Sequence, residues 1–192
     1  MSKTIMLNNV RLSYEHIFAP SAFDDSQDAK YSAVLIIPKD HPNLAALKRA
    51  FMEAGAEKFP TLFSGANAWP KGVACALKDA DKDTNASGEV LCEKNPEYKG
   101  AYILTANSSR RPRVVDRDGR STLDEQDGKV YSGCFINVAL GIAGYEFGKV
   151  KKGVKAYLNG VQFVANGERL GVDAMSMFGA LDGEDSEDNF MV

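Results

Sequence analysis

Cysteine is scarce in this sequence and does not form a recognisable motif. The chain of 192 residues has three cysteines, Cys75, Cys92 and Cys134, and no two of them make a C-x-x-C pair. The odd number argues against a disulfide framework, and the spacing argues against a zinc ribbon. We therefore expect buried free thiols, no metal site and no cofactor.

Long apolar runs are also missing. No stretch approaches the ~20 consecutive apolar residues that a membrane helix needs. The first residues contain no apolar run followed by a small-residue cleavage site, so they do not resemble a secretory signal. With 44% hydrophobic and 26% charged residues, the composition is that of an ordinary globular protein. The sequence predicts a soluble, cytoplasmic protein that contacts no membrane.

Catalytic motifs are absent as well. The two histidines, His16 and His41, fall in expected loop or cap positions, and no H-E-x-x-H, G-x-S-x-G or Walker loop occurs. A two-metal nuclease site is the one enzymatic alternative, and its carboxylates would be Asp116, Asp118, Asp124 and Glu125. Because these acids lie among turn residues and arginines, turn formation and solvation explain them better. We predict that the protein is not an enzyme.

The net charge of -3 is unevenly distributed. Between Asp182 and Val192 there is no base, and the acids are Asp182, Glu184, Asp185, Glu187 and Asp188. Of the 26 acidic residues, 21 therefore remain in residues 1–181, against all 23 bases. The body of the protein is mildly basic, and acidity is segregated at one end.

The first part of the chain reads as two strands and a loop. Alternating apolar residues predict a strand over 3–14, with a bulge at Asn8-Asn9. Prolines and aspartates predict a loop over 16–29. Residues 30–38, KYSAVLIIP, are rich in β-branched and apolar residues and predict a buried strand.

One helix and one long excursion follow. Asp40 is a plausible N-cap, and the apolar spacing after it predicts a helix over about 42–58, stopped by Pro60. Residues 60–97 are dense in Gly, Pro, Asn and Asp, which predicts a long loop excursion.

The second half is strongly β. Strands are predicted over 101–106 and 130–142, and a short one at Val114-Val115. In 130–142 one parity is apolar and forms a core face, while the aromatic side chains share the other parity and point away from it. Residues 153–172 predict two further strands joined at Asn166-Gly167, with Asn159-Gly160 either a turn or a bulge.

Several curved strands with one helix and no β-α-β repeat fit one architecture. The sequence predicts a mainly β protein, an OB-fold-like antiparallel β-barrel with one main helix and a long loop excursion. We expect a single domain over residues 1–178 and a disordered, flexible acidic C-terminal tail over residues 179–192.

Two basic segments are candidates for nucleic-acid binding. The first, SSRRPRVVDRDGR (108–120), holds five arginines and follows the strand that contains Tyr102. Guanidinium groups neutralise phosphates, and exposed rings stack on unpaired bases. The second, FGKVKKGVKAY (147–157), joins two predicted strands and holds four lysines flanked by Phe147 and Tyr157. Both have plainer interpretations, a solvated loop for the first and a lysine-protected edge strand for the second.

Trp69, the single tryptophan, lies in the irregular segment NAWPKG. An indole there can stack on a base or can pin the long loop to the body. We slightly favour the pinning role. The acidic segment also has two interpretations, because a solubilising tail explains its acids but not the apolar Phe190, Met191 and Val192 that follow them. An acidic segment with a hydrophobic tip can instead occupy a basic cleft or hook a partner protein.

The order AYILTANSSRRPRVVD, KVYSGCFINVALGIAGYEF and GVKAYLNGVQFVANGERLG resembles a phage single-stranded-DNA-binding family first catalogued as a domain of unknown function. The resemblance covers about residues 3–178 and is carried by R-P-x-V-V-D, Y-S-G-C and L-N-G-V-Q. It implies an OB fold related to the single-stranded-DNA-binding proteins of short-tailed phages. It also implies that Asp182 to Asp188 with Phe190 contact the replication machinery and compete with DNA.

These expectations combine into one hypothesis, a protein that binds single-stranded DNA without sequence preference in phage replication, recombination or repair. The expected phosphate contacts are Arg110, Arg111, Arg113, Lys149, Lys151, Lys152 and Lys155. The expected stacking rings are drawn from Tyr102, Tyr131, Phe135, Tyr157 and Trp69. Alternatives are an architectural or annealing protein that also binds duplex DNA, and a virion or interaction protein. A homodimer is compatible with the sequence.

Overall fold

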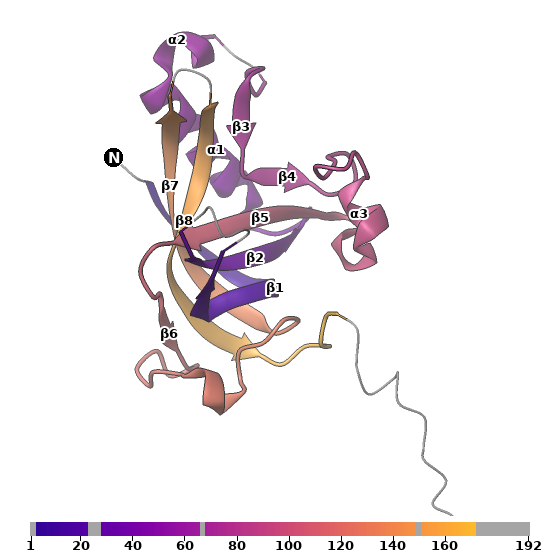
Figure 1. Ribbon diagram of the computed structural model, residues 1–192, viewed down its shortest axis with the longest axis vertical. Helices are drawn as coiled ribbons and strands as arrows, with labels where there is room; N and C mark the ends of the chain where they lie inside the picture. Colours follow the sequence, from indigo (N-terminus) through magenta and orange to yellow (C-terminus); the bar gives the residue numbers. More distant parts are fainter. Residues whose placement is uncertain (1–2, 23–27, 66–67, 149–150, 172–192) are drawn as a thin grey trace, which may run out of the picture.

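The computed structural model describes residues 3–22, 28–65, 68–148 and 151–171. Lys149 and the predicted acidic tail lie outside these ranges. Eight strands form one sheet (Figure 1): β1 Lys3–Ser21, β2 Lys30–Pro38, β3 Val73–Cys75, β4 Leu77–Asp79, β5 Ala101–Ser108, β6 Arg113–Val115, β7 Phe135–Phe147 and β8 Lys151–Ala165. The helices are α1 Leu44–Lys58, α2 Pro60–Phe63 and α3 Leu91–Lys94, with 3-10 turns η1 Pro96–Tyr98 and η2 Glu125–Asp127.

Five of the strands close into a barrel. β1 pairs antiparallel with both β2 and β7, β2 pairs with β5, and β7 pairs with β8. The barrel closes where β5 and β8 run parallel, at Ala106↔Ala156 and Asn107↔Tyr157. The order β1-β2-β5-β8-β7 is that of the five-stranded OB fold. The prediction of a mainly β, OB-fold-like barrel is confirmed, and the parallel closure is the one join that departs from the antiparallel pattern.

Alternate side chains of β7 point into the barrel core. Ile136, Val138, Leu140 and Ile142 are completely buried, as their shared parity predicts. The predicted boundaries of this strand were wrong, because β7 begins at Phe135 and continues to Phe147. Residues 130–134 instead form a turn, in which the Cys134 amide donates to the carbonyl of Tyr131.

β1 is longer than its sequence pattern indicates. The predicted loop over 16–29 was wrong in its first part, because β1 continues to Ser21 and pairs His16 with Ser32. β2 supplies hydrogen-bonding partners for this part of β1, although Pro20 in the sequence favours a loop. The bulge at Asn8-Asn9 is confirmed by a register shift and by Asn9, whose φ is 53°. The Asn9 amide, freed from the ladder, donates to Asn137 Oδ1 at 2.9 Å.

β8 runs unbroken through Asn159, which is a bulge rather than a turn: Leu158 faces Leu140, and Gly160 faces Ala139. The further strand predicted after Asn166-Gly167 is wrong, because residues 166–170 are irregular. There the Gly167 amide donates to the Tyr131 hydroxyl and the Leu170 amide to the carbonyl of Ser132, which carries the chain over the 131–133 turn instead of back along β8.

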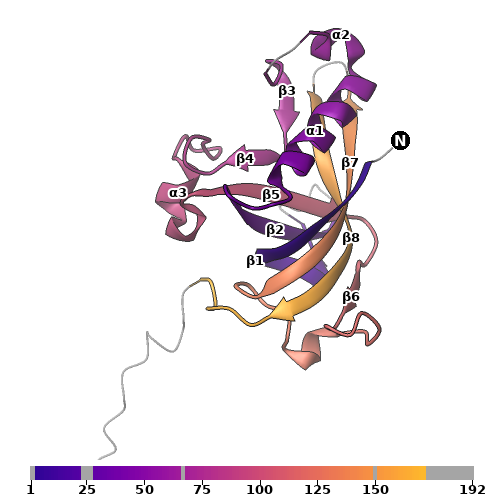
Figure 2. The ribbon, with the colours of Figure 1, turned by 180° about the vertical axis from the view of Figure 1, so that it is seen from behind.

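The main helix packs on the long strands. Leu44, Leu47, Phe51 and Ala54 recur at helical spacing and are buried against the barrel core, and α1 lies against β7, β8 and β1 (Figure 2). The helix is confirmed, but its N-cap is Asn43 rather than Asp40. No helix in the described ranges is long and apolar enough to span a bilayer.

The predicted excursion between residues 60 and 97 is partly a packed layer. Ala80 and Tyr98 join Ile36, Ala101 and Ile103 in a second apolar cluster that covers the outer face of β2 and β5. The Tyr98 hydroxyl hydrogen bonds to the buried hydroxyl of Ser13 at 3.1 Å. The 60–97 segment therefore buries the outer face of β2 and β5, and no residue of β8 belongs to this cluster.

We predict that Gly55→Ala lowers stability. Alanine normally stabilises a helix interior by about 1 kcal/mol relative to glycine. Here the added Cβ would lie 2.2 Å from Cζ of Phe63, so we expect overpacking to reverse the sign, for a net loss of about 1–2 kcal/mol. Denaturant unfolding measures the change. The exposed neighbour serves as control, since Ala56→Gly should cost only the ordinary ~1 kcal/mol, and a stabilised Gly55→Ala protein would contradict the packing.

Candidate nucleic-acid interface

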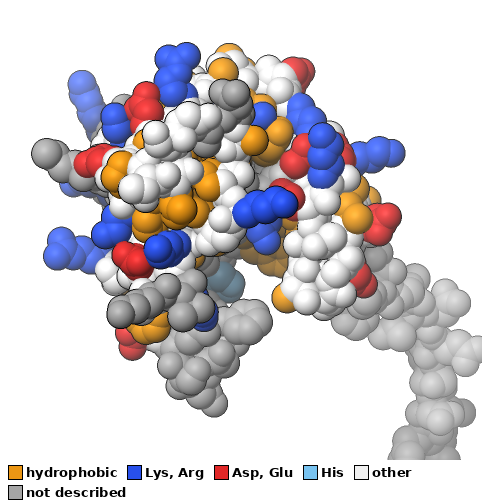
Figure 3. All heavy atoms as spheres, turned by 90° about the horizontal axis from the view of Figure 1, so that it is seen from above, with side chains coloured by type: hydrophobic (Ala, Val, Ile, Leu, Met, Phe, Trp, Pro, Cys, Tyr) orange, Lys and Arg blue, Asp and Glu red, His pale blue; other side chains and the backbone are white. Residues whose placement is uncertain are grey.

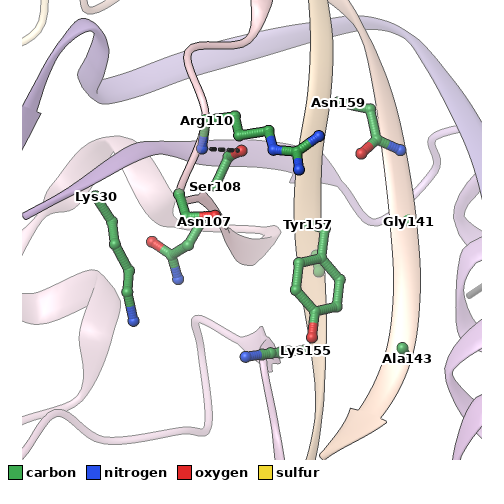
Figure 4. Close-up of a pocket in the computed structure, with 11 residues that line it drawn as sticks. Lys30, Asn107, Ser108, Arg110, Gly141, Ala143, Lys155, Tyr157 and Asn159 are labelled. Carbon is green, nitrogen blue, oxygen red and sulfur yellow. Dashed lines mark hydrogen bonds between the residues drawn. The ribbon is translucent and has the colours of Figure 1, made fainter. Parts of the chain in front are cut away.

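Two adjoining cavities lie along β8, and together we call them the β8 groove; Figure 4 shows the first of them. The first has a volume of about 570 Å³ and is lined by Lys30, Asn107, Ser108, Ser109, Arg110, Gly141, Ala143, Lys155, Ala156, Tyr157 and Asn159. The second has a volume of about 640 Å³ and is lined by Met6, Arg113, Val115, Gly119, Arg120, Asn137, Ala139, Asn159, Gly160, Val161 and Gln162. Both are lined by the bulge residue Asn159, so the two cavities meet at this residue.

The floor of the β8 groove is made by the outward parity of β7 and β8. Ala139, Gly141 and Ala143 face outward on β7, opposite Gly160, Tyr157 and Lys155 of β8 respectively. Side chains this small leave the sheet surface open. The wall is the connection from β5 into β6, and β6 is held in place by its parallel pairing with β8.

The β8 groove is cationic throughout. Its lining residues include no acid, and the cations are Lys30, Arg110, Arg113, Arg120 and Lys155. None of the five forms a salt bridge with a carboxylate of the described residues. Their charge therefore remains available to an anionic ligand. In Figure 3 lysines and arginines are spread around the α2 end of the molecule, so basic side chains alone would not have located this site.

One aromatic ring lies within the groove. Tyr157 is 37% exposed and, in Figure 4, stands between Arg110 and Lys155 along β8. The Lys155 ammonium is 4.9 Å from the Tyr157 ring centroid and 5.2 Å from that of Tyr145. A ring and cations side by side can bind a planar base and the phosphates that flank it.

The structure gathers four of the predicted contact residues in the groove: Arg110, Arg113, Lys155 and Tyr157. Arg111 turns away, pairing with Asp124 at 2.7 Å and lying 6.0 Å from the Phe18 ring. Lys151 and Lys152 line a separate cavity at the hairpin end of β7 and β8. Lys149 falls outside the described residues.

Trp69 pins the excursion to the body, the role that the sequence slightly favours. Its indole N–H donates to the carbonyl of Val73 at 2.6 Å. Its ring packs edge-on against Phe63 at 5.3 Å and lies 6.5 Å from Phe51. These contacts use the ring inside the protein, away from the β8 groove.

The other three predicted rings are also occupied by the protein's own contacts. Tyr102 is covered by Lys48, whose ammonium lies 4.0 Å from the ring centroid and 2.9 Å from the hydroxyl. Tyr131 donates to the carbonyl of Gly167 at 2.9 Å and lies under Arg169 at 4.3 Å. Phe135, at the start of β7, packs beside Gly167. None of the three lines the groove.

Several groove residues were not identified from the sequence. They are Lys30, Asn107, Arg120, Asn159 and Gln162. Lys30 is distant in sequence from the arginine segment and reaches it only because β2 pairs with β5, placing Tyr31 opposite Ser108. Arg120 belongs to the predicted arginine segment but not to the selected contacts.

The carboxylates of the alternative nuclease site have structural roles. Asp116 binds Lys129, and this hydrogen bond lowers the pKa of Asp116. Asp118 accepts from the hydroxyl of Ser121, which lowers the pKa of Asp118. Asp124 completes a capping box on η2. Turn formation and ion pairing thus account for Asp116, Asp118 and Asp124, and the described residues contain no cluster of three or more metal-ligating side chains.

All three cysteines are free. Cys134 is buried, as expected, whereas Cys75 and Cys92 are only partly buried. Burial raises the pKa of Cys75 to about 11. The thiol of Cys75 therefore stays protonated and unreactive at neutral pH.

The chain matches known proteins in both sequence and fold. A family model described as Enterobacter phage Enc34, ssDNA-binding protein, matches residues 3–191. Putative protein p50 of Acyrthosiphon pisum secondary endosymbiont phage 1 is 32% identical over 170 residues, which span 85% of this chain and 84% of that protein.

Solved structures give the same result. The single-stranded DNA-binding protein from bacteriophage Enc34, in complex with ssDNA, is 25% identical and superposes with a TM-score of 0.70, covering 88% of this chain and 89% of that one. The single-stranded DNA binding protein gp2.5 of bacteriophage T7 is 16% identical, with a TM-score of 0.61 over 95% of this chain and 98% of that one. The second likeness concerns the fold alone.

We predict that Trp69→Ala lowers the free energy of unfolding by about 3 kcal/mol, because it empties a packed site and frees the 68–72 segment. Chemical denaturation monitored by circular dichroism measures the loss. The matched control is Phe147→Ala, which removes a ring that is 77% exposed and should change stability by no more than ~0.5 kcal/mol. Equal stabilities for the two variants would show that Trp69 does not anchor the excursion.

Proposed function

Since this chain belongs to the family described as the ssDNA-binding protein of Enterobacter phage Enc34, we propose that it coats single-stranded DNA, without sequence preference, in phage replication, recombination or repair. The observation that carries the proposal is the β8 groove, whose lining holds five cations and no acid. Such a lining attracts a polyanion over its whole length.

The groove offers partners for both parts of a nucleotide. Arg110 and Arg113 on the wall can neutralise phosphates, and Lys30 and Lys155 can do so along the first cavity. The Tyr157 ring can stack on a base. Stacking favours unpaired bases, because bases in a duplex are already stacked on their neighbours. This supports a single strand over a duplex as the ligand.

The side-chain amide of Gln162 supports binding without sequence preference. The Gln162 side chain accepts from Asn137 Nδ2 at 2.9 Å and donates to the carbonyl of Arg117 at 3.2 Å. An amide already engaged on both sides has little capacity left to read base edges. Phosphate neutralisation and stacking, by contrast, act on every base alike.

We predict that neutralising Arg110, Arg113 and Lys155 together, each to Gln, weakens binding to oligo(dT). The slope of log affinity against log salt should fall in magnitude by about 2, because each phosphate contact on a single strand contributes about 0.7. Fluorescence anisotropy with labelled oligo(dT) at several salt concentrations measures both effects.

The matched control changes the same net charge elsewhere. Lys78, Lys82 and Lys99 are exposed and lie outside the β8 groove, on and beside the excursion. Their triple change to Gln should leave the salt slope nearly unchanged. Equal losses in the two triple variants would mean that overall charge, rather than the β8 groove, governs affinity.

The acidic segment completes the proposal. Residues 1–178 would form the DNA-binding domain, and the segment within 179–192 would compete with DNA for the β8 groove and contact replication proteins. The support is complementarity of charge, five acids near the end of the chain against five cations and no acid in the groove. Phe190 is the proposed hydrophobic contact for a partner protein.

We predict that deleting residues 182–192 tightens binding to single-stranded DNA and steepens its salt dependence, since phosphates no longer displace competing carboxylates. The same titration measures this change. A full-length variant with Asp182, Glu184, Asp185, Glu187 and Asp188 changed to their amides should behave like the deletion, whereas Phe190→Ala should bind DNA as the parent does. Unchanged affinity after deletion would remove the competition, though not the binding function.

A further inference from the structure

Tyr145 lies beside the β8 groove but belongs to a different cavity. In the pairing of β7 with β8, Tyr145 faces Gly153, two residues from Lys155 and on the same side of the sheet. The Lys155 ammonium is close to both rings, 5.2 Å from the Tyr145 centroid and 4.9 Å from the Tyr157 centroid. A ring, an ammonium group and a second ring therefore follow one another along β8.

Gly153 determines how the Tyr145 ring lies. A Cβ at Gly153 would come within 2.7 Å of the Tyr145 ring and hydroxyl. The phenol thus rests over the backbone of β8, a position that every other residue type at Gly153 would obstruct. The ring therefore lies over the outer surface of β8, outside the barrel core, and Tyr145 is only half-buried there.

A cavity of about 460 Å³ continues beyond this ring, and we call it the hairpin cavity. It is lined by Gly72, Val73, Ala74, Tyr145, Lys151 and Lys152. β3 makes one side of it through its parallel pairing with β8, with Ala74 opposite Gly153. The hairpin cavity is therefore floored by small residues and edged by lysines, as the β8 groove is.

The charge of the hairpin cavity rests mainly on Lys151. Lys152 is partly neutralised by Glu146, at 3.6 Å, and its ammonium lies 5.9 Å from the Phe59 ring. Lys151 is exposed and forms no salt bridge with any carboxylate of the described residues. Glu146 is not part of the cavity lining.

We propose that bound single-stranded DNA continues from the β8 groove over Tyr145 into the hairpin cavity. Tyr145 and Tyr157 stack on two bases, Lys155 binds the phosphate between them, and Lys151 binds the next phosphate. Residues on one face of a strand repeat about every 7 Å, so the three groups form an extended row suited to an unstacked chain. The inference rests on the proposed function and adds a second binding subsite to it.

The test compares oligonucleotide lengths. Affinities for oligo(dT) from about 4 to about 16 nucleotides, the range that OB folds cover, are measured for the parent, for Tyr145→Leu and for Tyr145→Phe. Oligonucleotides too short to span both subsites should bind the parent and Tyr145→Leu equally. Longer ones should bind Tyr145→Leu about tenfold more weakly, the effect of one lost stack. Tyr145→Phe keeps the ring and should match the parent at every length.

Lys151→Gln provides a second, milder variant that is not expected to disturb the fold. It should reduce the salt slope by about 0.7, and only with the longer oligonucleotides. If Tyr145→Leu bound oligonucleotides of every length as tightly as the parent does, the second subsite would be overturned and the proposed function would remain intact. Failure of the parent to bind any oligonucleotide would instead overturn the proposed function.

Discussion

The pairing of β7 with β8 is the interaction on which the rest of the structure depends. Its inward parity supplies Ile136, Val138, Leu140 and Ile142, which are completely buried in the core. Its outward parity supplies the floor of the β8 groove. Because strand side chains alternate, the same backbone satisfies both demands, and a register slip of one residue would exchange them. The stability of the barrel and the shape of the β8 groove thus both depend on the pairing of β7 with β8.

Much of the fold could be predicted from periodicity. The core face of β7, the strand β2 and the helix α1 have strong local patterns that tertiary contacts reinforce. The errors lie where hydrogen bonds come from distant segments. β1 continues through Pro20 because β2 provides partners, and the segment after Asn166-Gly167 folds onto the 131–133 turn because the Tyr131 hydroxyl binds there. Neither partner is visible in the local sequence.

The candidate site was only partly predictable, for a different reason. Charge clusters in the sequence predicted contacts in the segments around Arg110 and Lys155, and the structure places both residues in the lining of the β8 groove. Sequence could not show that Arg111 pairs with Asp124 or that Lys30 joins the groove across β2 and β5. Nor could the sequence show that Lys48 lies over the ring of Tyr102, or that Trp69 takes the slightly favoured pinning role through its hydrogen bond to the carbonyl of Val73.

The closure of the barrel has a consequence for how occupancy and folding are linked. β5 meets β8 only at Ala106 and Asn107, whose partners are Ala156 and Tyr157. This short pairing lies beneath the first cavity of the β8 groove, which is lined by Arg110 just after β5 and by Tyr157 of β8. A polyanion that binds both side chains would link the end of β5 to β8 across their short pairing. Ligand occupancy would then protect the barrel from opening at its shortest ladder, and resistance to unfolding would rise with the amount of ligand present.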